Sequence, residues 1–205
     1  DSKGKYWRYY EQDSTAQINR MERFLEHTQY CRKIIQHPNL LEVLGEIMDD
    51  EPILFKEKIN FKSSGGSGFD YHQDQAAGWS KYAPIFWSVA IAIDECNEEN
   101  GQLEIANHTT SSRESLGDWA PLTETILSDL VFQPIPMAPG DVAIFDSYVP
   151  HGSKPNHSSK PRKVMYLTYN QRKFGDLRTA YFNDKAQTYP QDCEREEGKE
   201  YIYKV

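Results

Sequence analysis

The apolar residues of this chain change their spacing once, near Pro52, and that change limits the folds open to the chain. Ahead of Pro52 they recur every three or four residues, which is typical of amphipathic helices. After Pro52 they alternate with polar residues in short runs, with turn residues roughly every 8–12 positions, which is typical of a sandwich or barrel. Helices followed by antiparallel strands predict an α+β order in one domain over residues 1–205.

The helical spacing predicts one helix over residues 14–36 and a second over residues 39–48. The alternation that follows predicts short strands at 53–62, 69–74, 85–93, 102–106, 131–136, 142–145 and 162–170. The glycine-rich stretch 63–68 predicts a loop. The tail, residues 171–205, is polar and has no clear period, so no element is predicted there.

Composition and charge argue against several classes of protein. The chain has 31 acidic residues against 23 Lys and Arg, and this balance disfavours nucleic acid as a partner because phosphate binding needs clustered basic residues. No apolar run approaches the roughly 18 residues of a membrane helix, and no signal peptide opens the chain. Three cysteines without CxxC spacing argue against a disulfide scaffold or a zinc site.

These observations predict a cytoplasmic protein that acts on a small molecule, with no nucleic-acid or membrane partner. They leave homo-oligomerisation open. The chain begins at Asp1 rather than at a methionine, which allows for missing sequence ahead of it.

Three side chains are candidates for a shared metal ion. His72 and Asp74 lie two residues apart in a predicted strand, so their side chains point to the same face. His151 follows a later predicted strand, and the chain of a small barrel can return it to the same mouth. Two histidines and one carboxylate form the facial triad of non-haem Fe(II) enzymes. Alone, a His-x-Asp pair is common on surfaces, and a turn histidine followed by glycine is usually structural.

Two predicted strands carry candidate anion contacts. Arg162 opens the last strand, where a guanidinium can hold a carboxylate in bidentate fashion, although a surface ion pair is the alternative. Alternation in strand 53–62 places Phe55, Ile59 and Phe61 on one face and Lys56, Lys58, Asn60 and Lys62 on the other. A half-exposed strand would turn these lysines to water, whereas a strand inside a sandwich would turn them to a pocket.

Together these residues resemble the phytanoyl-CoA dioxygenase (PhyH) superfamily of Fe(II)/2-oxoglutarate oxygenases. The matching stretches fall within about residues 50–170 and are Lys56–Lys62, Tyr71–Asp74, Glu98–Glu104, Pro139–Asp141 and His151–Ser153 with Arg162. The resemblance implies a double-stranded β-helix, a jelly-roll or cupin-like fold that is mostly β with flanking helices. In that fold the helices cover the outer face of the larger sheet.

The resemblance also implies cofactors and their ligands. Fe(II) would be held by His72, Asp74 and His151, and 2-oxoglutarate by Arg162 with Ser153 beside it and with Asn60, while O2 would be the second cosubstrate. Halogenases of this superfamily carry Gly or Ala in place of the aspartate. The presence of Asp74 therefore favours a hydroxylase, an oxidoreductase, over a halogenase.

A closer resemblance concerns the substrate. Residues 55–62, the GGxGF loop before His72 and the stretch 181–190 look like the bacterial branch that hydroxylates 2-aminoethylphosphonate or its N-trimethyl analogue. Such a zwitterion would need contacts for both of its charges. The candidates are Lys56 and Lys58 for the anionic group and Tyr71 and Trp79 for the ammonium. Core packing is the alternative role for each of these aromatic residues.

Other interpretations stay open. The same superfamily contains amino-acid, natural-product and acyl-CoA hydroxylases, and the acidic charge of this chain counts against a CoA substrate. The non-enzyme alternatives are a metal-binding cupin-like module without turnover and a structural protein with incidental histidines.

Overall fold

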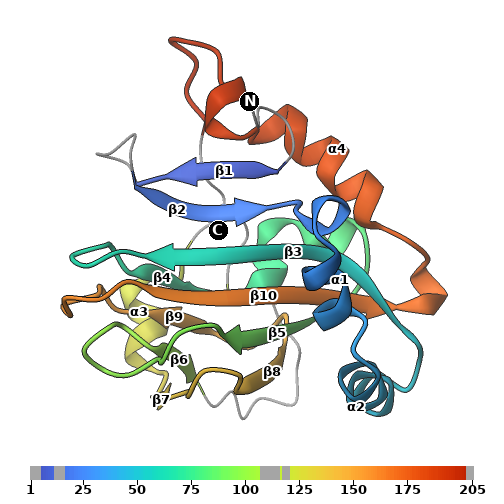
Figure 1. Cartoon of the computed structure of the whole chain (residues 1–205), viewed down its shortest axis with the longest axis horizontal. Coiled ribbons are helices and arrows are strands. Elements are labelled where there is room, and N and C mark those ends of the chain that lie inside the picture. The colour runs from blue at the N-terminus through green and yellow to red at the C-terminus, as the bar shows by residue number, and fades with distance from the viewer. Residues whose placement is uncertain (1–5, 12–16, 107–115, 117–120, 202–205) are drawn as a thin grey trace.

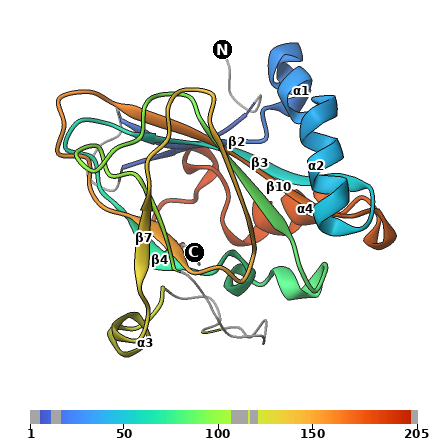
Figure 2. The same ribbon diagram turned by 90° about the horizontal axis from the view of Figure 1, so that it is seen from below.

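Two antiparallel β-sheets form the framework of the protein (Figures 1 and 2). The computed structural model describes residues 6–11, 17–106, 116 and 121–201. The larger sheet has the strand order β1-β2-β3-β10-β5-β8, and the smaller sheet has the order β4-β9-β6-β7. This alternation of the chain between two sheets is the predicted double-stranded β-helix, and that prediction is confirmed.

The bounds of the elements are as follows. The larger sheet contains β1 (Trp7–Tyr10), β2 (Ile18–Glu22), β3 (Pro52–Lys62), β10 (Arg162–Gln171), β5 (Trp87–Ala92) and β8 (Val142–Asp146). The smaller sheet contains β4 (Phe69–His72), β9 (His151–Ser153), β6 (Leu103–Ala106) and β7 (Phe132–Ile135). The helices are α1 (Gln29–Ile35), α2 (Pro38–Met48), α3 (Glu124–Ser128) and α4 (Arg178–Thr188). No helix in the described ranges is long and apolar enough to cross a bilayer.

Helices α1 and α2 lie on the outer face of the larger sheet (Figure 2). Pro38 occupies the first turn of α2, where its missing N–H costs no hydrogen bond. The buried residues that join these helices to the sheet are Ile35, Leu44, Met48, Val89, Met165 and Leu167. Each such side chain contributes about 1.5–3 kcal/mol by its burial. Because the outer face is an apolar core, the polar residues of the same strands turn to the inner face.

Strands β3 and β10 form the central pair of the larger sheet. The register skips Phe55, since Leu54 and Lys56 face consecutive residues of β10, so Phe55 is the extra residue of a bulge. The prediction that Phe55 shares a face with Ile59 is therefore wrong. Ile59 packs beneath the helices, whereas Phe55 joins a separate aromatic cluster that contains Trp79.

The single helix predicted over residues 14–36 is also wrong. Residues 18–22 form β2 and residues 29–35 form α1, while residues 14–16 lie outside the described part of the chain. Met21 fits a helical period, but it pairs with Ile59 of β3, between the edge strand β1 and the centre of the sheet. Arg23 then adopts a φ of 55°, which neither a helix nor a strand continues. Pairing with an existing sheet outweighs the local period here.

The tail that showed no period contains α4. Its buried residues Tyr181 and Phe182 pack in the aromatic cluster with Trp7 of β1 and Phe55 of β3. The strand predicted at 69–74 ends at His72, and the short strands β1 and β9 were not predicted. The second helix and the other predicted strands are confirmed to within a few residues.

Buried ion pairs attach α4 to the larger sheet. Lys185 donates a hydrogen bond of 2.6 Å to Glu22, and Arg20 lies 3.0 Å from the other oxygen of the same carboxylate. On the next strand, Arg178 donates to Glu57 through Nε at 3.2 Å. Burial alone would raise the pKa of Glu22, but Lys185 and Arg20 hold this pKa at about 2. Glu22 is therefore an ionised carboxylate between two cations.

We expect Glu22→Gln to lower the free energy of unfolding by about 3–5 kcal/mol, because it leaves two buried cations without their counter-charge. Urea unfolding followed by circular dichroism measures this change. Glu46→Gln, on the exposed side of α2, is the matched control and should change stability by less than about 0.5 kcal/mol. Equal midpoints for the two variants would show that the ion pairs do not hold α4 in place.

Candidate functional site

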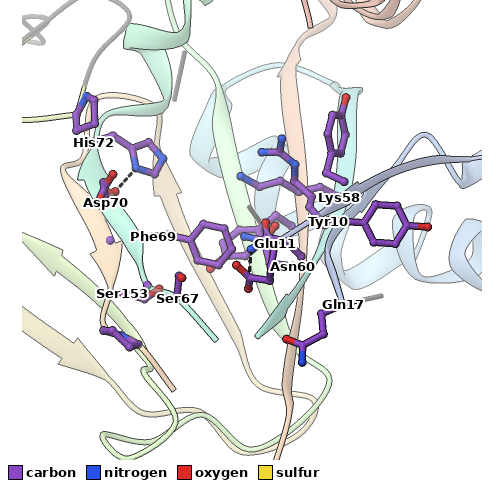
Figure 3. A pocket seen from close by; sticks show the side chains of 18 of the residues that line it. Tyr10, Glu11, Gln17, Lys58, Asn60, Ser67, Phe69, Asp70, His72 and Ser153 are labelled. Carbon is purple, nitrogen blue, oxygen red and sulfur yellow. Dashed lines mark hydrogen bonds between the residues drawn. The ribbon is translucent and has the colours of Figure 1, made fainter. Parts of the chain in front are cut away.

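A cavity of about 1360 Å³ is lined by residues of both sheets. Figure 3 shows Lys58 and Asn60 of the larger sheet on one side and His72 and Ser153 of the smaller sheet on the other. Both ends of the described chain add to the lining through Tyr9, Tyr10, Tyr189, Arg195 and Tyr201. The cavity therefore brings together residues that are far apart in the sequence.

The two candidate metal-binding histidines lie opposite each other. Strands β4 and β9 pair antiparallel with His72 directly opposite His151, and their rings are 4.4 Å apart. Nδ1 of His72 lies 2.6 Å from the carbonyl oxygen of Asp70, and Nδ1 of His151 lies 2.9 Å from that of Val149. A hydrogen bond from Nδ1 to a carbonyl places the proton on Nδ1, so the lone pair of Nε2 is free to bind a metal.

Asp74 completes this group from a different element than predicted. It begins the 3-10 helix Asp74–Ala77 instead of continuing β4, so the shared strand face proposed for His72 and Asp74 is wrong. Its Oδ1 nevertheless lies 3.7 Å from Nε2 of His72 and 3.9 Å from Nε2 of His151. Ser88 of β5 donates a hydrogen bond of 2.7 Å to Oδ2 and thereby fixes the carboxylate.

The charge states of these groups suit a divalent metal ion. Burial and the neighbouring His72 lower the pKa of His151 to about 4, so this imidazole is neutral near pH 7. Burial alone would raise the pKa of Asp74, but His151, His72 and Lys58 hold it well below its usual range. One ligand atom from each residue lies within 4.8 Å of the others. Two imidazoles and one carboxylate fit the facial triad of non-haem iron.

The three residues implied for 2-oxoglutarate differ in position. Ser153 and Asn60 line the cavity, whereas Arg162 is not among its lining residues. Ser153 follows His151 by two residues on β9. The guanidinium of Arg162 is buried and contacts Sγ of Cys96 at 4.0 Å. Within the described residues, Nε of Arg162 and Oδ1 of Asn60 are buried without a hydrogen-bond partner. Unpaired buried polar atoms are costly. A carboxylate would accept a hydrogen bond from Nε of Arg162, whereas Oδ1 of Asn60 needs a donor.

Lys62 connects this region to the histidine strand. Its ammonium donates to the Gly101 carbonyl at 3.0 Å, to Oγ of Ser153 at 2.8 Å and to the Lys154 carbonyl at 2.5 Å. A side chain at residue 101 would collide with Lys154, since a Cβ there would lie 2.1 Å from its carbonyl oxygen. Lys62 faces Arg162 across β3 and β10. It thus brings Ser153 toward Arg162, although Lys62 itself does not appear in the cavity lining.

The candidate substrate contacts fall into two groups. Lys58 and Tyr71 line the cavity, whereas Lys56 and Trp79 do not. The ammonium of Lys56 lies 4.6 Å from the centre of the Trp79 ring and donates to the Tyr181 hydroxyl at 3.3 Å. An internal cation therefore occupies the aromatic face that was a candidate for the ammonium of the substrate. Because the bulge at Phe55 interrupts the alternation of β3, Phe55 and the aromatic residues packed on it lie beside Lys56.

Several residues of the site had no role in the sequence analysis. Ser88 interrupts the apolar run 85–93, and this single polar residue was the available signal for a buried partner. Glu104 of β6 accepts a hydrogen bond from the Tyr71 hydroxyl and pairs with Lys154 at 2.9 Å. Tyr9 and Arg195 come from segments without a clear pattern. Tyr189 lies in the stretch 181–190 that carries the closer resemblance, but no role was assigned to it, and Arg195 stacks 4.2 Å from its ring.

Comparison with known proteins agrees with this site. The chain is 35% identical over 206 residues to a 2-aminoethylphosphonate dioxygenase from the uncultured bacterium HF130_AEPn_1. This alignment covers 98% of this chain and 78% of that protein. It is 33% identical over 192 residues to a methylphosphonate hydroxylase from Gimesia maris, and this alignment covers 91% of this chain and 72% of that protein.

A solved structure supports the fold. The apo form of EctD from S. alaskensis superposes with a TM-score of 0.69 at 21% identity over 81% of this chain, which spans 61% of the EctD chain. The family model described as phytanoyl-CoA dioxygenase (PhyH) matches residues 5–164. That match covers most of the chain, including the three candidate metal ligands. The predicted resemblance is confirmed, and the chain belongs to the phytanoyl-CoA dioxygenase (PhyH) family.

Proposed function

We propose that the protein is an Fe(II)- and 2-oxoglutarate-dependent dioxygenase that hydroxylates a C–H bond of a small phosphonate, with 2-aminoethylphosphonate as the first candidate. The observation that carries the reaction class is the convergence of His72, Asp74 and His151 at one cavity in a member of the PhyH family. The two relatives named for phosphonate substrates, each more than 30% identical, support the substrate class.

The proposed roles follow the geometry of the site. His72, Asp74 and His151 would hold Fe(II), and Arg162 would hold the distal carboxylate of 2-oxoglutarate, with Ser153 and Asn60 as further contacts. When bound, Fe(II) and 2-oxoglutarate supply an oxidation in which O2 converts 2-oxoglutarate to succinate and CO2 and adds a hydroxyl group to the substrate.

The residues of the chain position these groups. The carbonyls of Asp70 and Val149 hold both imidazoles in the tautomer that leaves Nε2 free. The hydrogen bond from Ser88 holds Oδ2 of Asp74, so Oδ1 faces the two Nε2 atoms. The buried guanidinium of Arg162 has an unpaired Nε–H, and a carboxylate there would satisfy it. Fixed ligands and a fixed cosubstrate reduce the entropy lost on reaching the reactive geometry.

We expect purified protein supplied with Fe(II), ascorbate, O2 and 2-oxoglutarate to form succinate, and 2-aminoethylphosphonate to stimulate that formation at least about tenfold. The measurement compares 2-aminoethylphosphonate, its N-trimethyl analogue, methylphosphonate, free amino acids and an acyl-CoA. If only an amino acid stimulates succinate formation, the proposed reaction class is supported and a phosphonate substrate is ruled out. No succinate from iron-loaded protein would favour a metal-binding module without turnover.

His151→Ala should abolish iron-dependent turnover, because it removes one of three proposed ligands. It should also weaken metal binding, which calorimetry with Co(II) measures independently of activity. His157→Ala, at an exposed histidine, is the control and should behave as the wild type. Retained turnover in His151→Ala with an unchanged circular dichroism spectrum would mean that the third ligand is misassigned.

Arg162→Met should raise the KM for 2-oxoglutarate roughly 10- to 100-fold, since hydrogen bonds to a charged group contribute about 1.5–3 kcal/mol. Steady-state kinetics at saturating substrate measures this change. Arg172→Met, at an exposed arginine in the 3-10 helix that follows β10, serves as the matched control. A KM that changes equally in both variants would place the carboxylate anchor elsewhere.

A further inference from the structure

Lys58 differs from Lys56, Lys62 and Lys185 because its ammonium has no hydrogen-bond or ion-pair partner among the described residues. It lines the cavity, and Nζ lies over the ring of Tyr166, 5.1 Å from its centre. Across residues 6–11, 17–106, 116 and 121–201, this ammonium makes no hydrogen bond and no ion pair. A lysine beside a cavity can therefore offer all three of its N–H donors to a ligand.

The acidic residue paired with Lys58 across the sheet does not form an ion pair with it. Glu22 lies directly opposite Lys58 across β2 and β3. Its carboxylate, however, is already bound by Lys185 at 2.6 Å and by Arg20 at 3.0 Å. The pairing of Glu22 with these two cations leaves Lys58 without a counter-charge from its own sheet.

The neighbouring Lys56 has a different environment. It is buried against the Trp79 ring and donates to the Tyr181 hydroxyl. The inner face near Glu22 thus carries four basic side chains, namely Arg20, Lys56, Lys58 and Lys185, and two acids, Glu22 and Asp74. Burial lowers the pKa of Lys56 well below its usual range. Lys58 combines a cavity position with an ammonium that has no hydrogen-bond partner among the described residues. An anionic ligand at Lys58 would pair with this ammonium.

Lys58 also lies near the candidate metal ligands. Its charge contributes to the lowered pKa of Asp74 and to the lowered pKa of His151. Figure 3 shows the Lys58 side chain across the cavity from His72. A small substrate held by Lys58 would therefore occupy the space between the lysine and the two histidines.

We propose that Lys58 binds the acidic oxyanion of the substrate and makes the site selective for phosphonates, with or without an amino group. This inference rests on the function proposed above and names the residue that recognises its substrate class. A phosphonate anchored at Lys58 presents the carbon next to phosphorus as the carbon closest to that anchor. Charge-assisted hydrogen bonds to an oxyanion are about twice as strong as neutral ones, so the acidic group would dominate the affinity.

Direct binding tests this proposal without turnover. Protein loaded with Zn(II), which is diamagnetic, and with 2-oxoglutarate is titrated with methylphosphonate and with 2-aminoethylphosphonate, and binding is followed by 31P NMR. Lys58→Met keeps the length of the side chain and removes its charge. Lys58→Arg keeps the charge, and Lys33→Met on the exposed side of α1 is the matched control.

We expect Lys58→Met to raise the Kd of both phosphonates at least about tenfold, while Lys58→Arg and Lys33→Met stay within about threefold of the wild type. The effect should be equal for the two ligands because they share the phosphonate and differ in the amine. Unchanged binding in Lys58→Met, a loss confined to the aminated ligand, or a loss of 2-oxoglutarate affinity alone would each overturn the assignment. So would a wild type that binds neither phosphonate.

The turnover assay separates this inference from the proposed function. If wild-type protein hydroxylates a phosphonate and Lys58→Met retains the wild-type KM, the function stands and the role of Lys58 is rejected. If wild-type protein binds phosphonates through Lys58 without hydroxylating them, the binding role stands and the proposed reaction is rejected. A rise in KM in Lys58→Met with partial rescue in Lys58→Arg supports both.

Discussion

The register of two short strands is the constraint on which the candidate metal site depends. Strand β9 has only three residues, and His151 lies opposite His72 because of its pairing with β4. A slip of one residue would turn one imidazole to the other face of the sheet. The hydrogen bond from Gln73 to the Tyr148 carbonyl ties the segments that follow His72 and precede His151. Backbone pairing and side-chain hydrogen bonds thus fix the same geometry.

Charge is distributed unevenly around the cavity, and this distribution connects stability with binding. Glu22 holds α4 to the sheet by pairing with Lys185, and Arg20 shares the same carboxylate. The same pairing removes the acid that would otherwise neutralise Lys58. The interactions that assemble this wall of the cavity therefore leave Lys58 without a counter-charge from the larger sheet. A positive charge at this position favours an oxyanion over a neutral ligand there.

The sequence predicted the strands with strong alternation and the residue types of the site, but not the details set by tertiary contacts. β3 was recognised because its alternation continues over most of its length. The bulge at Phe55 is set by pairing with β10 and leaves no local signal. Met21 kept a helical period and still became part of a strand. Asp74 reached the two histidines from a 3-10 helix, because only the position of its carboxylate matters to a metal ion.

The C-terminal part of the chain contributes to the site from beyond the family match. The match ends at residue 164, and all the residues proposed to hold iron and 2-oxoglutarate lie within it. Tyr166, Tyr189 and Arg195 line the cavity from beyond that limit. Tyr9 stacks on Tyr189 with ring centres 5.5 Å apart, so β1 and the segment after α4 form one wall. A change in this wall alters what the cavity admits and leaves the groups proposed for the oxidation in place.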